Sequence, residues 1–244
     1  MPELPEVEII KRNLTESLLN KTFLSVEVYC DKLRYKIPQN FIETIKNKKV
    51  VNIERIAKYI FVTLDNNNIL VIHLGMTGNF LVNHTDDEII PIKHTHIKFL
   101  MSNFRVIRYI DIRRFGFIII FESGKDVASF FDKRLGVDAI SSKFNSEYLI
   151  NKLKNKKIDI KNALLDQKIV GGVGNIYASE ALYRAGISPF ERSEDIAKRN
   201  KKIDNVISSI KFILKDAIKV CGSTISDYKN MDGESGYFQY KFNV

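Results

Sequence analysis

The pattern of apolar residues changes near residue 132, and this change constrains the fold of the 244-residue chain more than any other feature. Before it, segments rich in Ile, Val, Phe and Tyr predict β-strands. These segments are 22–29, 50–56, 59–64, 69–74, 94–101, 105–110 and 115–121. After it, apolar residues recur at helical spacing, which predicts helices over 146–154, 160–165, 175–185 and 194–220.

Helical spacing also occurs at the start of the chain, where Val7, Ile10, Leu14 and Leu18 predict a helix over roughly 5–20. The sequence therefore predicts an α+β fold, in which an N-terminal β-sandwich with a leading helix is followed by an all-helical domain. A cleft between two such halves is a natural place for a ligand.

The same patterns suggest where the domains begin and end. We expect a β-sandwich domain over 1–131, a linker over 132–145, a helical domain over 146–235, and a final segment over 236–244 that reads as one strand without a partner.

The charge and the cysteines limit the kind of protein. The net charge of +9 favours a polyanionic partner such as nucleic acid. Because Cys30 and Cys221 lie far apart, neither a disulfide framework nor a zinc ribbon is expected. The start of the chain, MPELPEVEII, is acidic and lacks the apolar core of a secretory signal, and the apolar run over 115–121 is too short to span a bilayer. We therefore expect a soluble, cytosolic protein.

The first residues of the chain could carry covalent chemistry. Removal of Met1 would expose the secondary amine of Pro2, and amines act as nucleophiles toward electrophilic carbon by forming an iminium. Glu3 would stand beside it for general acid–base catalysis. The alternative is structural, because a proline and acidic residues also suit the first turn of a helix.

Three further segments have both a structural and a functional interpretation. Residues 171–174 read GGVG and precede a predicted helix, so their backbone N–H groups could bind an anion, although a tight turn explains them as well. Met76 lies in a glycine-containing turn, and Arg113 and Phe115 lie at the entry to a strand. Residues of these types can insert into DNA, but a methionine more often fills a gap in the hydrophobic core, and an arginine more often lies on the solvated surface.

Two nucleotide-binding classes and a metal site are disfavoured. The GGVG segment lacks the GxxxxGK[ST] pattern and does not follow a βαβ unit. His94 and His96 share one face of a strand but have no acidic or cysteine partner at ligand spacing, so no metal is expected there.

Six motifs in order carry a resemblance that the single segments do not. They are MPELPEVE, AKYIFVTL, HLGMTG, IDIRRFG, GVGNIYASEALYRAGI and CGSTISDYKNMDGESGYFQ. Together they resemble the formamidopyrimidine-DNA glycosylase family over the whole chain, from Met1 to Val244. Leu4 and residues 222–239 resemble these enzymes more than their endonuclease VIII relatives.

The resemblance implies an enzyme of base-excision repair, a bifunctional DNA glycosylase and AP lyase that removes 8-oxoguanine and formamidopyrimidines. Pro2 would attack C1′ of the damaged nucleotide, Glu3 would protonate the opening sugar, and Lys58 would donate a proton during β-elimination. The partner would be double-stranded DNA with oxidised bases or abasic sites, bound by a monomer in a bacterial-type cytoplasm. Helices around 160–185 would form a helix–two-turns–helix element.

The resemblance also implies three groups of DNA contacts. One group fills the gap left by the extruded nucleotide, a second binds phosphates, and a third is a loop that closes over the damaged base. The first comprises Met76, Arg113 and Phe115, the second His94, Lys156 and Asn175, and the third includes Ser223, Thr224, Ile225 and Tyr228.

The chain departs from the family at its end. The family continues into a β-hairpin zinc finger with four cysteines, whereas this chain stops at Phe242-Asn243-Val244. We therefore expect a truncated chain that holds no zinc, needs no other cofactor, and lacks support for the δ-elimination that the finger assists. Two alternatives stay open: a non-catalytic DNA-binding remnant, and an endonuclease VIII-like enzyme for oxidised pyrimidines.

Overall fold

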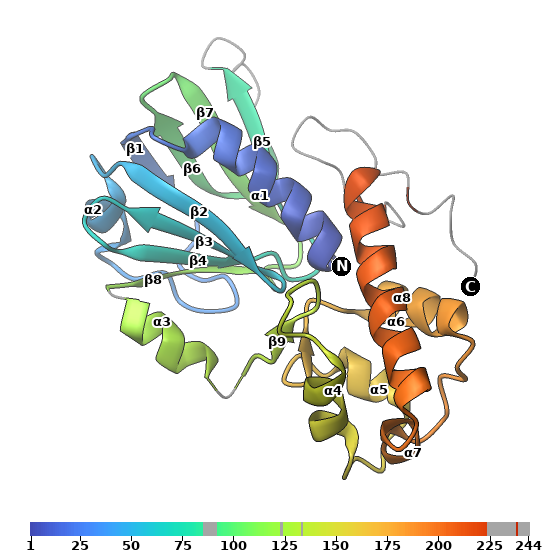
Figure 1. Ribbon diagram of the computed structural model, residues 1–244. Coiled ribbons are helices and arrows are strands. Elements are labelled where there is room, and N and C mark those ends of the chain that lie inside the picture. The colour runs from blue at the N-terminus through green and yellow to red at the C-terminus, as the bar shows by residue number, and fades with distance from the viewer. Residues whose placement is uncertain (85–91, 123, 133, 224–237, 239–244) are drawn as a thin grey trace.

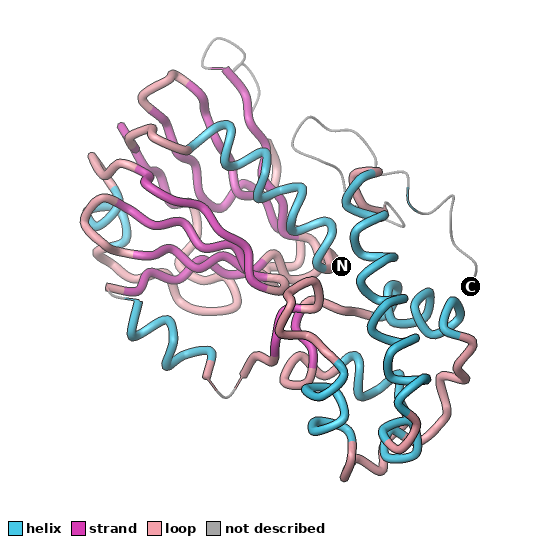
Figure 2. Tube along the Cα trace, in the orientation of Figure 1, coloured by secondary structure: helices cyan, strands magenta, loops and turns pink. Residues whose placement is uncertain are grey.

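The computed structural model describes residues 1–84, 92–122, 124–132, 134–223 and 238. The strands gather in one half of the molecule and most helices in the other, as predicted (Figure 1, Figure 2). The fold is α+β, with an N-terminal β-sandwich that carries a leading helix, followed by a helical half.

The β half consists of two antiparallel four-stranded sheets within the described ranges. The first has the order β1 (Phe23–Val28), β6 (Thr95–Met101), β7 (Arg105–Asp111) and β5 (Gly78–His84). The second has the order β2 (Val50–Ile56), β3 (Tyr59–Leu64), β4 (Ile69–His73) and β8 (Phe117–Phe121). Alternate residues of the strands point into a common apolar core.

Two short helices accompany the sheets. Helix α2 (Phe41–Ile45) follows β1 and buries Phe41 and Ile45. Helix α3 (Gly124–Phe131) follows β8, and its Phe131 packs against Tyr59 and Phe61 on β3. This second contact covers the outer face of the second sheet with aromatic rings.

Helix α1 (Leu4–Leu18) lies between the two halves (Figure 1). Its Val7, Ile10 and Leu14 belong to the core of the β half, whereas Leu4 and Ile9 belong to the core of the helical half. A helix with apolar residues on two faces is buried from both sides. The N-terminus is therefore placed at the junction of the halves.

The helical half has a core of its own. Its elements are β9 (Val137–Asp138), α4 (Ser146–Leu153), α5 (Ile160–Leu165), β10 (Val170–Gly171), α6 (Asn175–Ala185), α7 (Ser193–Ala197) and α8 (Asn200–Lys219). Strands β9 and β10 pair in parallel. None of the helices described is long and apolar enough to cross a membrane.

One predicted helix is wrong as a single element. The segment 194–220 contains two helices, α7 and α8, because Arg199 leaves the helical conformation with φ −122° and ψ 87°. Ile196 and Ile203 are both buried and lie seven residues apart, a spacing that one continuous helix would also give. The strand expected over 236–244 lies outside the described residues apart from Phe238.

Candidate active site and nucleic-acid interface

Glu3 precedes the first turn of α1, and Leu4, the residue after it, is bound to the helical half. The N–H of Glu3 donates to Oε2 of Glu6 at 2.9 Å, and the N–H of Leu4 donates to the carbonyl of Gly172 at 3.1 Å. Pro2 and Glu3 are buried, whereas Met1 is 53% exposed. The contacts of Glu3 and Leu4 fix the start of α1 at the junction of the halves, directly after the buried Pro2.

The Glu3 carboxylate occupies the N-terminus of α6. Its Oε2 accepts from the N–H of Gly174 at 2.7 Å, and its Oε1 accepts from the N–H of Ile176 at 3.0 Å. A Cβ on Gly174 would lie 2.3 Å from the carboxyl carbon of Glu3, so glycine is needed for this close approach. The glycine-rich segment therefore binds an anion, and the anion is a side chain of the same protein.

Opposing effects bring the pKa of Glu3 to about 7. Burial raises it most, the charge of Lys58 lowers it, the charge of Glu6 raises it, and the two backbone N–H groups lower it. A carboxyl group with a pKa near neutrality can both give and take a proton at physiological pH. Glu3 is thus suited to general acid–base catalysis.

Lys58 lies in the turn between β2 and β3, directly after Ala57, which has a φ of +55°. Its side chain is buried, and burial lowers its pKa, an effect that the charges of Glu3 and Glu6 partly oppose. Lys58 has no hydrogen bond or ion pair with any part of the chain that the structure describes. A buried lysine of this kind gives up its proton more readily than a surface lysine.

Glu6 and Tyr177 belong to the same buried group, and neither was predicted as a site residue from the sequence. Oε1 of Glu6 accepts from the Tyr177 hydroxyl at 2.5 Å and from the N–H of Ser223 at 2.9 Å. Burial, followed by the charge of Glu6, raises the pKa of Tyr177 well above its usual value, so the hydroxyl stays a donor. The spacing of Glu3 and Glu6, typical of a helix cap, was the available signal.

Ser223, the first residue of the expected base-recognition loop, is therefore in contact with Glu6. It is buried, and its N–H contact to Glu6 ties the end of the segment after α8 to helix α1. The other expected loop residues, Thr224, Ile225 and Tyr228, lie outside the described residues.

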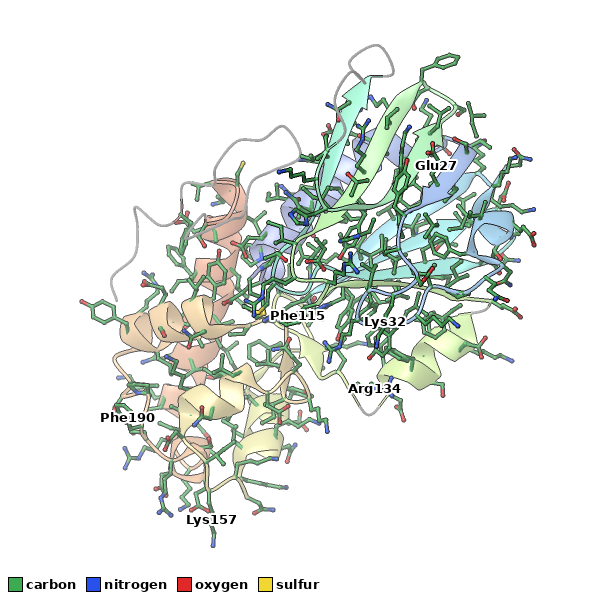
Figure 3. The ribbon with its side chains drawn as sticks, turned by 180° about the vertical axis from the view of Figure 1, so that it is seen from behind. Glu27, Lys32, Phe115, Arg134, Lys157 and Phe190 are labelled. Atoms are coloured by element: carbon green, nitrogen blue, oxygen red, sulfur yellow. The ribbon has the colours of Figure 1, made fainter. Side chains whose placement is uncertain are left out.

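Met76, Arg113 and Phe115, which we call the insertion trio, come from two loops that touch. A Cβ on Gly75 would lie 2.4 Å from the backbone of Phe115 and Gly116. The Arg113 guanidinium lies over the Phe115 ring at 4.7 Å from its centre. Met76 and Phe115 are 39% and 47% exposed, and Phe115 lies near the junction of the halves (Figure 3). Strand β8 starts at Phe117, so Phe115 lies in a loop and not in the predicted strand.

Comparison with known proteins gives the family. The model of the formamidopyrimidine-DNA glycosylase N-terminal domain matches residues 1–118, and that of the formamidopyrimidine-DNA glycosylase H2TH domain matches residues 135–229. A formamidopyrimidine-DNA glycosylase of Rickettsia bellii is 40% identical over 244 residues, which are 100% of this chain and 88% of the relative. The chain belongs to the formamidopyrimidine-DNA glycosylase family.

Solved structures of the family agree with the fold. The MutM (Fpg) protein of Thermus thermophilus matches with a TM-score of 0.84 at 33% identity, over 98% of this chain and 85% of that one. The Fpg protein of Lactococcus lactis in complex with DNA that contains an abasic site matches with a TM-score of 0.88 at 27% identity, over 98% and 86%. The resemblance inferred from the six motifs is confirmed.

The phosphate-binding residues expected for a formamidopyrimidine-DNA glycosylase do not all lie together. Asn175 is exposed in the first turn of α6, directly after Gly174, and His94 is exposed beside the end of β7, where its carbonyl accepts from the N–H of Asp111. Lys156 is exposed in the turn after α4. Its neighbour Lys157 lies at the end of the helical half that is remote from Phe115 (Figure 3).

A zinc site does not fit the residues described. Cys30 lies in the β half and Cys221 follows α8, both as free thiols. In the ranges that the structure covers, no group of three or more His, Cys, Asp and Glu residues is placed to hold a metal ion. We derive no chemistry through a metal for this glycosylase-family chain.

Proposed function

We propose that this chain is a bifunctional DNA glycosylase and AP lyase of base-excision repair, which removes 8-oxoguanine and formamidopyrimidines from duplex DNA. One observation carries the proposal. The carboxyl group of Glu3, with a pKa of about 7, is fixed next to Pro2 and is electrostatically coupled to the buried Lys58. A proton-transfer group of suitable pKa beside an N-terminal amine is what an iminium mechanism needs.

The reaction begins when Met1 is removed. With Met1 attached, the nitrogen of Pro2 is part of a peptide bond and its lone pair is delocalised. The free amine attacks C1′ of the damaged nucleotide, the bond from C1′ to the base breaks, and the base leaves with the proton that the amine nitrogen loses. Protonation of the ring oxygen by Glu3 opens the sugar and leaves an iminium between Pro2 and C1′.

The same iminium leads to strand scission. It makes the C2′ proton acidic, so loss of this proton expels the 3′-phosphate by β-elimination, and Lys58 supplies a proton during this step. Water then releases Pro2 from C1′. We also propose that this chain acts as a cytoplasmic monomer.

Borohydride trapping tests the proposal, because borohydride reduces an iminium to a stable amine. Purified protein is first checked for loss of Met1 by intact mass. It is then incubated with borohydride and a duplex that carries 8-oxoguanine opposite cytosine, and separately with a pre-formed abasic site. We expect a covalent adduct with both, which peptide mapping assigns to Pro2, and a sharp loss of adduct in Glu3→Gln and in protein that retains Met1.

The outcomes separate the alternatives. No adduct with either DNA, in a folded protein that has lost Met1, would favour a non-catalytic DNA-binding protein. An adduct with oxidised pyrimidines but not with 8-oxoguanine, in a panel of damaged bases, would favour an endonuclease VIII-like enzyme. An unchanged rate of strand scission in protein that retains Met1, and so has no free amine at Pro2, would contradict the nucleophile.

A further inference from the structure

Asp111 is a buried carboxylate that the proposed chemistry does not use. It is the last residue of β7, its exposure is 0%, and it has no cationic partner in the described part of the chain. Leaving a carboxylate buried without a cation is costly unless hydrogen bonds satisfy its oxygens. Three donors do so, and all of them belong to the segments that carry the insertion trio or to β7 itself.

The contacts of Asp111 connect both loops of the trio. Its Oδ2 accepts from the N–H of Gly116 at 2.8 Å and from the Tyr109 hydroxyl at 3.3 Å. Its Oδ1 accepts from the Thr77 hydroxyl at 2.5 Å, and the Thr77 oxygen in turn accepts from the N–H of Arg113 at 3.0 Å. Gly116 follows Phe115 in the chain, and Thr77 follows Met76.

Each member of the trio is thus adjacent to a backbone or side-chain group held by Asp111. Close packing restricts the same loops further, since Gly75 and Gly116 leave no room for a Cβ. The N–H of Arg34 also donates to the carbonyl of Gly116 at 3.0 Å. The backbone beneath the trio is therefore fixed, while the Met76 and Phe115 side chains stay exposed.

We infer that Asp111, acting through Thr77, is a positioning residue that holds Met76, Arg113 and Phe115 ready to enter the base stack. The inference rests on the proposed function, because only an enzyme that extrudes a nucleotide needs residues to replace it. Insertion between bases requires unstacking, and side chains that are already placed do not add the entropic cost of ordering their loops.

Thr77 is the residue to vary. Asp111→Ala would leave the N–H of Gly116 and the hydroxyl of Tyr109 without their acceptor in the core, and the protein could fail to fold. Thr77→Val keeps the shape of the side chain but removes the hydroxyl that joins Asp111 to Arg113. Thr77→Ser keeps the hydroxyl. Thr44→Val is the matched control, because its hydroxyl donates to the Asn40 carbonyl in α2, away from the insertion loops.

Two substrates distinguish the loss of a correctly positioned insertion trio from a general loss of catalytic activity. Removal of 8-oxoguanine from duplex DNA requires extrusion of a nucleotide, whereas β-elimination at an abasic site in single-stranded DNA does not. We expect Thr77→Val to slow the duplex reaction by about tenfold, the effect of one lost buried hydrogen bond. The single-strand reaction should stay within about twofold, and Thr77→Ser and Thr44→Val should behave like the wild type in both. Thermal unfolding confirms that each variant is folded.

A failure of the positioning role can be distinguished from a failure of the proposed function. Equal losses on the two substrates, or no loss on the duplex in Thr77→Val, would overturn the positioning role while leaving the proposed function intact. A wild-type protein that forms no borohydride adduct on either substrate would overturn the proposed function and, with it, this inference. Failure of Thr77→Ser to restore the duplex rate would also count against the role of the hydroxyl.

Discussion

At the scale of single residues, Glu3 takes its properties from segments far apart in the sequence. Its carboxylate meets the N–H groups of Gly174 and Ile176 and the charge of Lys58. Burial alone would favour the neutral acid, while the N–H groups and the lysine favour the carboxylate. The balance leaves its pKa near neutrality, so the residue that caps α1 can hold or release a proton near pH 7.

The raised pKa of Glu3 predicts how stability depends on pH. The pKa rises from 4.5 in the unfolded chain to about 7 in the folded protein, so the folded protein holds a proton that the unfolded chain has lost between these pH values. The contribution of Glu3 to stability is therefore greatest below pH 4.5 and falls as the pH rises to about 7. The fall is at most about 1.4 kcal/mol per pH unit.

Urea unfolding of the wild type and Glu3→Gln at several pH values measures this effect. Glutamine does not titrate, so the free energy of unfolding of the wild type should decrease relative to that of the variant across the window. Parallel pH profiles for the two proteins would show that the pKa of Glu3 is not raised in the folded state.

Gly174 gives a second prediction at this scale. Its φ of −129° suits any residue, and the nearest obstacle to alanine is the Glu3 carboxyl group, whose carbon lies 2.3 Å from the added Cβ. We expect Gly174→Ala to fold, to displace the Glu3 carboxylate by about 1 Å and to slow single-turnover excision by about 100-fold. Gly124→Ala is the control, because nothing lies within 4 Å of its Cβ. Equal excision rates in the two variants would refute the need for close approach.

At the scale of elements, the sequence predicts most strands and several helices within one or two residues. Strands β2 and β3 and helices α5 and α6 have the predicted ends, because their apolar patterns are strong and a Gly or polar run bounds them. Strand β5 was missed, since Gly78-Asn79 looks like the continuation of a turn. The short helices α2 and α3 were missed as well, because helices of this length are too short to show a clear periodicity of apolar residues.

The site was less predictable than the fold. Pro2 and Glu3 were candidates from the residues themselves and, like Lys58, received their roles through the resemblance, whereas Asp111 and Tyr177 were not predicted. Both depend on buried hydrogen bonds between segments, and no periodicity marks such contacts. The glycines at 171–174 predicted an anion site, but the sequence could not show that Glu3, 171 residues before Gly174, supplies the anion.

The contact between α1 and α6 gives a prediction at the element scale. The Tyr177 hydroxyl on α6 donates to Glu6 on α1 at 2.5 Å, and both residues are buried. Tyr177→Phe removes this donor from a buried carboxylate, so we expect a loss of about 1–3 kcal/mol in the free energy of unfolding. Tyr183→Phe on the same helix is the control, because Tyr183 is 58% exposed. Equal stability of the two variants in urea would contradict the proposed contribution of the α1–α6 contact.

At the scale of the whole molecule, the two halves have separate cores and are joined by helix α1 and by a partly buried ionic cluster. Arg55 of β2 donates to Glu8 of α1 at 2.8 Å and to Asp138 of β9 at 2.6 Å. Asp138 also accepts from the N–H of Ala57 at 2.7 Å. A residue at the start of the helical half therefore holds the turn that carries Lys58 in the β half.

Asp138→Asn tests whether this connection matters for both stability and catalysis. Arg55 keeps its bond to Glu8, so we expect a loss of about 2 kcal/mol, below the cost of isolating a buried charge. Because the turn of Ala57 and Lys58 loses part of its anchor, β-elimination at an abasic site should slow by about tenfold, while the affinity for abasic DNA changes little. Asp195→Asn is the control, since its ion pair with Lys198 is exposed and should contribute nothing measurable.

If Asp138→Asn lost stability but kept the wild-type elimination rate, the cluster would join the halves without placing Lys58. If the affinity for abasic DNA fell along with the rate, the effect would extend beyond Lys58, and the connection would place the two halves relative to one another.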